Sequence, residues 1–321
     1  MALKRTIEAK PFLKWAGGKT QLLPVLDAHL PAHFSEIPEV TYIEPFVGGG
    51  AMLFHMLRTY PNIQSAIIND LNGKLINAYR IIRNSPQELI ECLTDIQMRF
   101  YELADNMQRK DFFLSYRERF NREKLTKSEN AAILIFLNRT CFNGLYRENS
   151  KGEFNVPFGR YVNPTICDKE TILANSRLLQ KVTILNGDFS MATGNNNGYT
   201  FIYFDPPYRP LSNTSNFNSY VKEPFNDNEQ IRLRDHVVEL TQKDVHILLS
   251  NSDGRASNPQ DLFFDHIYNQ FHINRIEARR NINANALGRG VTSELLIRNY
   301  ERCKGVNHIM PVQQQLFYAN V

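Results

Sequence analysis

Short apolar runs alternate with longer segments of helical periodicity along this chain of 321 residues, and this alternation limits the fold more than any other feature. The runs that we interpret as buried strands are 42–44, 65–68, 182–185, 201–204, 246–249, 272–278 and 294–298. The helical segments are 19–30, 50–60, 73–83, 86–100, 128–139, 169–180 and 226–242. Strands that alternate with helices form βαβ units, so we predict an α/β fold with a mostly parallel sheet. Because no helix separates the last two runs, we expect them to form an antiparallel pair at one end of the sheet.

One segment, residues 71–165, departs from this alternation, because it is rich in helical pattern and contains no convincing strand. It ends in a polar loop with several asparagines and glycines, residues 138–164. We therefore predict a helical domain, 71–165, inserted between the second and third strands. Residues 1–70 and 166–321 would then form the domain that carries the sheet.

The composition excludes several classes of protein. No run of about 18 apolar residues occurs, and the first residues lack the apolar core of a signal peptide. The four cysteines, Cys92, Cys141, Cys167 and Cys303, form no Cys-x-x-Cys pair, so neither a metal site nor a disulfide framework is expected. We expect a cytoplasmic protein without membrane contact. The net charge of +4 is only mildly basic and does not by itself indicate nucleic acid.

Acidic residues stand at the ends of four candidate strands: Glu44, Asp70, Asp188 and Asp205. In an open parallel sheet, ligands bind beyond the carboxyl ends of the strands. A single acid there is ordinarily a helix N-cap, but four in the same position indicate a ligand pocket. The turn Pro-Phe-Val-Gly-Gly-Gly at 45–50 lacks the glycine spacing of dinucleotide-binding proteins. A nucleotide-like ligand without a pyrophosphate is therefore favoured, and Asp70 is placed for its ribose hydroxyls.

A second glycine turn, Trp-Ala-Gly-Gly-Lys-Thr, occupies residues 15–20. It is not a phosphate-binding P-loop, because Leu13 stands where that motif requires glycine. The turn presents Lys19 as a point charge for a carboxylate or a phosphate. Trp15, the only tryptophan, is interpreted either as a packed aromatic or as a ring that lines the ligand site.

The sequence Asp-Pro-Pro-Tyr at 205–208 ends the strand predicted at 201–204. Neither proline can donate a sheet hydrogen bond, and together they make a rigid turn. The Asp205 carboxylate and the Pro206 carbonyl are both acceptors, which suits an amino group with two N–H donors. Tyr208 offers a face on which a planar ring can stack. The set describes a pocket for the exocyclic amine of a nucleobase, and the alternative is a turn with a helix-capping aspartate.

Several motifs resemble those of the Dam-type DNA adenine-N6 methyltransferases and occur in the order of that family. They are FLKWAGGKT, EPFVGGG, IINDLN, LNRTCFNGLYRENSKGEFNVPFGRY and DPPYRPLSNTSNF, within residues 11–300. The resemblance implies a Rossmann-like S-adenosylmethionine-dependent methyltransferase sheet with an inserted helical DNA-recognition domain. It also implies site-specific transfer of a methyl group from S-adenosyl-L-methionine to the exocyclic amino group of adenine in duplex DNA.

The resemblance also implies a role for each residue at the strand ends. Trp15 and Lys19 would border the cofactor's methionine end, and Asp70 would hold its ribose. Asp188 with Phe189 would border its adenine. The cofactor-binding set is completed by Glu44 and Asp205. The catalytic residues would be Asp205, Pro206 and Tyr208. Because adenine inside a duplex cannot reach a buried methyl donor, it would be flipped out and stacked on Tyr208, with Phe217 as a candidate second wall. Its neutral amine would then attack without prior deprotonation.

DNA recognition is implied for the loop that ends the inserted segment. Side chains suited to base edges, to insertion into the base stack or to recognition of GATC are Phe142, Asn143, Leu145, Arg147, Asn149, Pro157 and Tyr161. A related branch that recognises GATATC shares LNRxCFNG and FNVPF, whereas the continuation FGRY favours GATC. Arg139 is interpreted as either structural or DNA-contacting. Arg279, Arg280 and Arg289 are interpreted as phosphate contacts or as part of a solvated loop.

Two rival functions remain open at this point. A ribosomal RNA adenine methyltransferase would share Asp-Pro-Pro-Tyr, but the polar loop at 138–161 argues against it. A catalytically silent DNA-binding protein would not need Lys19, Asp70 and Asp205. The family resemblance further implies a bacterial or phage protein associated with the nucleoid, with double-stranded DNA as partner and no obligatory protein partner.

Overall fold

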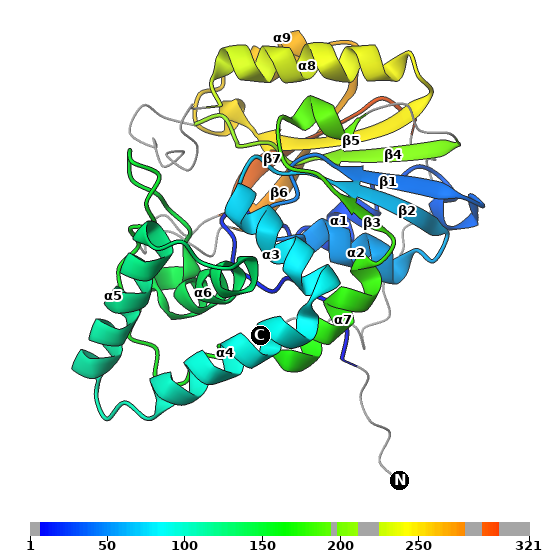
Figure 1. Cartoon of the computed structure of the whole chain (residues 1–321). Coiled ribbons are helices and arrows are strands. Elements are labelled where there is room, and N and C mark those ends of the chain that lie inside the picture. The colour runs from blue at the N-terminus through cyan, green and yellow to red at the C-terminus, as the bar shows by residue number, and fades with distance from the viewer. Residues whose placement is uncertain (1–6, 194–197, 211–224, 280–290, 302–321) are drawn as a thin grey trace.

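The structure is a computed structural model that describes residues 7–193, 198–210, 225–279 and 291–301 (Figure 1). Phe217, Arg280 and Arg289 lie outside the described residues, as does the side chain of Arg279, whose backbone ends the sixth strand. Within the described part of the chain, no helix is both long and apolar enough to cross a membrane.

A seven-stranded sheet forms the centre of the molecule, in the order β3-β2-β1-β4-β5-β7-β6. Its strands are β1 (Val40–Glu44), β2 (Ile63–Ile68), β3 (Val182–Ile184), β4 (Tyr199–Phe204), β5 (Val245–Ser252), β6 (His272–Arg279) and β7 (Val291–Arg298). The strands from β1 to β5 pair in parallel. β7 is antiparallel to both β5 and β6. Each predicted strand is present, and the antiparallel pair at one end of a Rossmann-like sheet is confirmed.

The described helices cover both faces of the sheet and build the inserted segment. They are α1 (Leu23–Asp27), α2 (Ala51–Thr59), α3 (Gly73–Asn84), α4 (Pro86–Tyr101), α5 (Asn106–Arg122), α6 (Lys127–Thr140), α7 (Lys169–Leu179), α8 (Asp227–Thr241) and α9 (Phe263–Ile267). The helix predicted at 19–30 is wrong in length, because within that range only the shorter helix α1 (Leu23–Asp27) forms. Pro24 has no N–H to donate and is accommodated only in a first turn, so the helix begins next to it.

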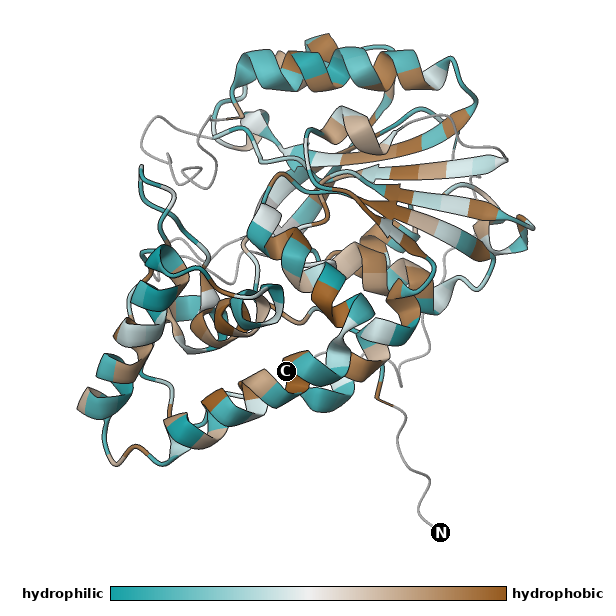
Figure 2. Cartoon of the chain, viewed as in Figure 1, coloured by the Kyte–Doolittle hydropathy of each residue, from teal (hydrophilic) through white to brown (hydrophobic). Residues whose placement is uncertain are grey.

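The core lies on both faces of the sheet, as the alternation along β4 shows. Phe201 and Tyr203 belong to the hydrophobic cluster shared with α2, α3 and α7, whereas Ile202 and Phe204 pack with α8 and α9. Successive side chains of a strand point to opposite faces, so a strand that is buried on both sides is apolar throughout. Figure 1 shows α8 and α9 on one side of the sheet and α2, α3 and α7 on the other, and Figure 2 shows hydrophobic residues gathered on the central strands.

The inserted segment extends to one side of the sheet, where α4, α5 and α6 lie (Figure 1). α3 lies against the sheet domain, because Arg80 and Arg83 donate to the carbonyls of Ile184 and Val182 in β3 at 3.1 and 2.8 Å. Within 71–165 the only β pairings are two isolated bridges, Cys141 with Phe158 and Glu148 with Phe154. The segment therefore carries helices and one hairpin-like loop, but no strand of the sheet.

Candidate active site and recognition loop

Parallel pairing brings the carboxyl ends of β1, β2 and β4 to one edge of the sheet. Glu44 is in register with Ile68, and the Asn69 N–H donates to the Glu44 carbonyl at 3.0 Å. The Gly187 N–H, which precedes Asp188, donates to the Asp70 carbonyl at 3.3 Å. The predicted acidic strand ends therefore share one edge, as parallel pairing requires.

Asp70 links the glycine turn after β1 to the start of α3. Its carboxylate accepts hydrogen bonds from the backbone N–H groups of Gly48 and Asn72 at 3.0 and 2.9 Å. Burial raises the pKa of Asp70, and these hydrogen bonds partly oppose that rise by favouring the ionised form. Asp70 is thus an acceptor held at the mouth of the turn, where a hydroxyl group of a ligand can donate to it.

Trp15 lies on the glycine turn rather than free in a pocket. A Cβ added at Gly49 would lie 2.8 Å from the Trp15 Cβ, so only glycine allows this approach. The indole ring stacks on Tyr146 of the inserted segment, with ring centroids 5.2 Å apart. Trp15 therefore packs on the turn and joins it to the inserted segment, and its place in the cofactor-binding set stays a prediction.

Beneath the turn, the structure buries a carboxyl group and an amide. Glu44 accepts a hydrogen bond from the Tyr42 hydroxyl at 2.8 Å, and burial raises the pKa of its carboxyl group. The Asn69 side-chain N–H donates to the carbonyls of Pro45 and Gly187 at 3.1 and 2.9 Å. The Asn69 Oδ1 is buried and has no hydrogen-bond partner among the described residues. Asn69 thus holds the turn after β1 against the loop after β3 through its side-chain N–H group.

Asp188 is held by Arg232 of α8 in a two-pronged ion pair, with N···O distances of 3.1 and 2.7 Å. These hydrogen bonds and those from Ser190 hold the pKa of Asp188 well below its ordinary value. The Arg232 guanidinium lies 4.1 Å from the centroid of the Phe189 ring. Phe46 and Phe225 pack around the same ring, so the end of β3 offers an aromatic wall beside a charged pair.

Asp205 is the centre of a compact cluster at the end of β4. The Lys19 Nζ lies 3.0 Å from its Oδ1, and the Ser250 hydroxyl donates to the same oxygen at 3.0 Å. Lys19 also lies 4.2 Å from the centroid of the Tyr208 ring. The Tyr208 hydroxyl donates to Glu294 at 2.8 Å. Burial raises the pKa of Asp205, and the Lys19 ammonium opposes that rise.

Ser250 and Glu294 were not identified from the sequence. Ser250 follows the apolar start of β5, at the end of the next parallel strand after β4. Glu294 opens the apolar run of β7, and because β7 is antiparallel to β5, the start of β7 meets the end of β5, with Glu294 opposite Ser252. A polar residue at the beginning of a strand expected to be antiparallel was the signal that could have found it.

The double-proline turn is held from outside by side chains of α8 and the following loop. Gln230 donates to the Pro207 carbonyl at 3.0 Å. Arg209 forms ion pairs with Asp227 and Asp261 and lies over the Phe263 ring. These contacts fix the position of Asp205, Pro206 and Tyr208 relative to the sheet.

Recognition residues predicted in the loop 138–161 are gathered by a hairpin-like fold. Asn138 holds the loop to the N-terminal segment, because its side chain bonds to the backbone N–H and carbonyl of Lys14 at 2.9 and 2.8 Å. Arg147 donates to the Asn155 side chain at 2.7 Å, and Asn149 accepts from the Lys151 and Glu153 N–H groups at 2.9 and 3.0 Å. Both residues are thus held by partners within the loop.

The remaining predicted recognition residues lie around the base of the same loop. Phe142 is 50% exposed, and Asn143 adopts a left-handed backbone conformation with φ of 56°. The Phe142 N–H donates to the Pro157 carbonyl at 2.8 Å, Leu145 packs against the core, and Tyr161 lies under the Lys14 ammonium at 5.0 Å. The loop therefore leaves the Phe142 ring half-exposed beside Asn143, whereas Leu145 is packed.

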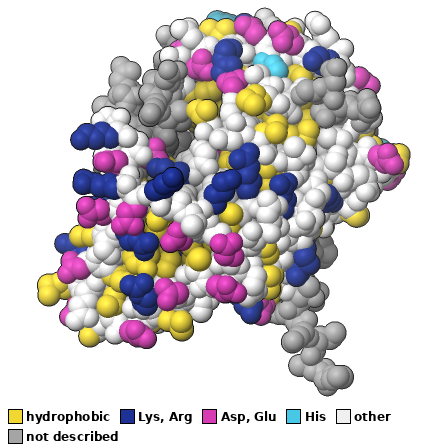
Figure 3. Space-filling view, viewed as in Figure 1, with side chains coloured by type: hydrophobic (Ala, Val, Ile, Leu, Met, Phe, Trp, Pro, Cys, Tyr) yellow, Lys and Arg dark blue, Asp and Glu magenta, His cyan; other side chains and the backbone are white. Residues whose placement is uncertain are grey.

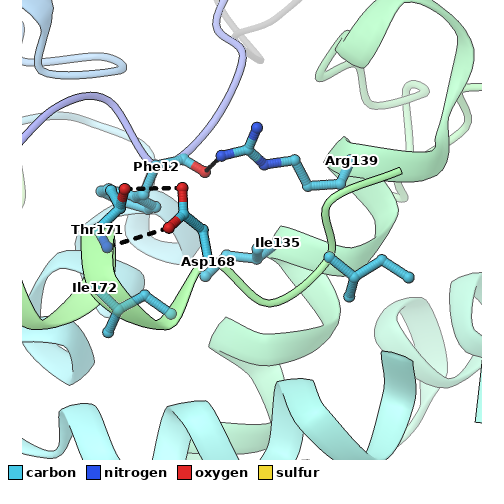
Figure 4. A pocket seen from close by; sticks show the side chains of 7 residues that line it. Phe12, Ile135, Arg139, Asp168, Thr171 and Ile172 are labelled. Carbon is cyan, nitrogen blue, oxygen red and sulfur yellow. Dashed lines mark hydrogen bonds between the residues drawn. The ribbon is translucent and has the colours of Figure 1, made fainter. Parts of the chain in front are cut away.

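Arg139 has a structural role. It donates to the Phe12 carbonyl at 2.9 Å and, with Asp168 and Thr171, lines a small pocket between the N-terminal segment, α6 and α7 (Figure 4). This pocket shares no lining residue with the cluster around Asp205. Within the described residues, no group of three or more His, Cys, Asp and Glu side chains could hold a metal ion.

The sheet order and the acidic strand ends with their Asp-Pro-Pro-Tyr turn define a Rossmann-like methyltransferase. The family model of the D12 class N6 adenine-specific DNA methyltransferases matches residues 15–282, and the chain belongs to that family. It is an adenine-specific DNA methyltransferase, and its substrate is DNA.

Curated relatives match nearly the whole chain. The type II methyltransferase M.MjaIII of Methanocaldococcus jannaschii is 45% identical over 92% of this chain and 100% of its own length. The type II methyltransferase M1.LlaDCHI of Lactococcus lactis subsp. cremoris is 41% identical over 92% of this chain and 98% of its length. A DNA adenine methylase of Vibrio cholerae is 33% identical over 89% and 95%. These names support the resemblance seen in the sequence motifs.

Proposed function

We propose that this enzyme transfers a methyl group from S-adenosyl-L-methionine to the exocyclic amine of a flipped-out adenine, within the duplex sequence GATC. The observation that carries this proposal is the geometry of Asp205. Within the described part of the chain, the polar contacts of its carboxylate both fall on Oδ1, from Lys19 and Ser250. The Oδ2 oxygen is therefore left to accept a hydrogen from a substrate amine.

The amine would be held by Asp205 and by the Pro206 carbonyl. Two acceptors for two N–H donors orient the nitrogen lone pair away from the ring, so that most of the acceleration comes from positioning. The adenine would stack on the Tyr208 ring, which lies 4.2 Å from the Lys19 Nζ. Flipping costs a few kcal/mol of stacking and pairing, which the stacking on Tyr208 partly offsets.

The residues at the other strand ends fit S-adenosylmethionine. Asp70 would accept from the ribose hydroxyls, because its carboxylate is held at the glycine turn by the N–H groups of Gly48 and Asn72. Phe189 with Asp188 would border the adenine moiety, and Lys19 the methionine end. The cofactor, when bound, supplies the electrophilic methyl group, and the chain contributes its orientation and the exclusion of water.

The recognition loop would provide sequence specificity. Arg147 carries a guanidinium suited to a guanine edge, and the exposed ring of Phe142 is suited to fill the stack that adenine leaves. Lys and Arg side chains gather across the middle of the face in Figure 3, which suits the phosphate backbone. We propose that residues 71–165 form the recognition domain, and that 1–70 and 166–321 form the catalytic domain.

The proposal is tested with labelled S-adenosylmethionine and three duplexes that contain GATC, GATATC or a permuted sequence without either. We expect label in the GATC duplex, together with altered cleavage by restriction enzymes that are sensitive to adenine methylation. Equal labelling of all three duplexes would contradict the specificity. Labelling of the GATATC duplex alone would assign the enzyme to the other branch, and no labelling of any duplex would contradict the activity.

A further inference from the structure

Glu294 is a carboxylate of the cluster around Asp205, and it has no part in the cofactor-binding or adenine-binding roles proposed for that cluster. It lies in β7 opposite Ser252 of β5, at the same edge as Asp205. Its Oε2 accepts a hydrogen bond from the Tyr208 hydroxyl at 2.8 Å and lies 4.0 Å from the Lys19 Nζ. One carboxylate therefore contacts both the lysine and the ring that flank Asp205.

Lys19 stands between two carboxylates, and its side chain is only 6% exposed. It lies 3.0 Å from Asp205 and 4.0 Å from Glu294. Charges interact strongly where water is largely excluded. A carboxylate that pairs with the Lys19 ammonium is therefore a weaker acceptor for any other donor. A substrate amine that donates to Asp205 depends on that same negative charge. A second carboxylate that shares the ammonium leaves Asp205 the better acceptor.

We propose that Glu294 is a positioning residue for methyl transfer, which shares the Lys19 ammonium with Asp205 and thereby keeps Asp205 available to the target amine. The inference rests on the role proposed above for Asp205. The second contact of Glu294 is the hydrogen bond from the Tyr208 hydroxyl, which holds the Tyr208 ring beside the Glu294 carboxylate.

The simpler reading is that Glu294 only accepts the Tyr208 hydrogen bond. The two readings are separated by double-mutant cycles, because two residues that act through one contact show non-additive effects. Glu294→Gln keeps an acceptor for the Tyr208 hydroxyl but removes the charge that attracts Lys19. Lys19→Gln removes the ammonium, and Tyr208→Phe removes the hydroxyl that donates to Glu294.

The experiment measures single-turnover methyl transfer with saturating S-adenosylmethionine and a GATC duplex. Glu277→Gln is the matched control, because Glu277 is an exposed carboxylate on the neighbouring strand β6. We expect Glu294→Gln to lower the rate about 10-fold in the wild-type background and less than about 2-fold in the Lys19→Gln background. Glu277→Gln should leave the rate unchanged. Equal losses in both backgrounds, or coupling to Tyr208→Phe alone, would overturn the proposal.

The pH profile gives a second readout that a purely structural role would not move. Charged and titratable groups that face Asp205 from its surroundings are Lys19, Tyr42, Glu44, Tyr203, Tyr208 and Glu294. Asp205 must be ionised to accept the amine, so its pKa sets the acid limb of the rate. Removing the Glu294 charge lowers that pKa, and removing the Lys19 charge raises it.

We therefore expect the acid limb to move to lower pH in Glu294→Gln and to higher pH in Lys19→Gln. An acid limb that stays in place in Glu294→Gln would overturn the proposal even if that variant proved less stable. The proposed function is tested separately by the wild-type protein and Asp205→Ala. If both behave as proposed and Glu294→Gln matches Glu277→Gln, only the role of Glu294 fails.

Discussion

The indole ring of Trp15 stacks on the ring of Tyr146, with centroids 5.2 Å and planes 24° apart. Trp15 rests on the glycine turn that follows β1, and Tyr146 belongs to the loop 138–161. The Tyr146 hydroxyl donates to Glu148, which also accepts from Lys74 of α3 at 2.8 Å. A continuous set of packed side chains therefore connects the end of β1 with the segment proposed to contact DNA.

This stack predicts a fluorescence response, because Trp15 is the only tryptophan of the chain. Binding of S-adenosylmethionine at the turn and of a GATC duplex at the loop should each change its emission. In Tyr146→Leu, the response to the duplex should weaken while the response to the cofactor persists. Titration of each ligand into the two proteins checks this, and emission that ignores both ligands would separate Trp15 from the site.

Arg147 is held by Asn155, and this predicts linked effects on specificity. Arg147→Ala should weaken discrimination at one base position by about 1–3 kcal/mol, because a guanidinium contact to a base edge is lost. Asn155→Ala should weaken discrimination at the same position by less, since the guanidinium remains but is no longer fixed. The measurement is kcat/KM on duplexes with single base changes, with the exposed Lys151→Ala as control. An unchanged preference in Arg147→Ala removes it from base recognition.

Gly50 adopts a φ of 75°, and a Cβ added there would collide with the Tyr79 hydroxyl, which donates to the Gly48 carbonyl. Gly50→Ala should therefore lower the free energy of unfolding by about 2–4 kcal/mol, from backbone strain together with overpacking. Gly198→Ala is the control, because Gly198 has a φ of 84° with open space around it. Gly198→Ala should cost only the strain, about 1–2 kcal/mol. Equal losses in denaturant unfolding would show that contact with Tyr79 is unimportant.

The Asp188–Arg232 pair predicts how stability depends on pH. Arg232 lowers the pKa of Asp188 below its ordinary value of 3.8, so the pair stabilises the fold above that pH and less as the pH falls through the lowered value. Because both side chains are more than a third exposed, the contribution is at most about 1 kcal/mol. Arg232→Gln should flatten the fall in melting temperature below pH 4. If the melting temperatures of the two proteins fall equally with pH, the pair contributes nothing to stability.

The sequence predicted much of this fold because the relevant signals are local. The apolar runs and the acids that end them identify the strands and the edge of the sheet at which both Asp70 and Asp205 lie. α5 was not identified, because only Phe113, Tyr116 and Phe120 of its residues are buried and charged residues obscure the periodicity. Glu294 could not be assigned to the site without knowing that β7 runs against β5, which depends on pairing between distant segments. Partners such as Arg232 for Asp188 are likewise set by tertiary packing.

The most direct test of the central claim asks whether Asp205 is needed to methylate adenine in duplex DNA. Wild-type protein and Asp205→Ala are incubated with S-adenosylmethionine and a duplex that carries one GATC, and N6-methyladenine is quantified by mass spectrometry of the digested DNA. Duplex affinity is measured alongside, so that loss of binding is not mistaken for loss of chemistry. We predict N6-methyladenine with the wild-type protein and none with Asp205→Ala, at similar affinity for the duplex. Near-normal N6-methyladenine from Asp205→Ala would contradict the account.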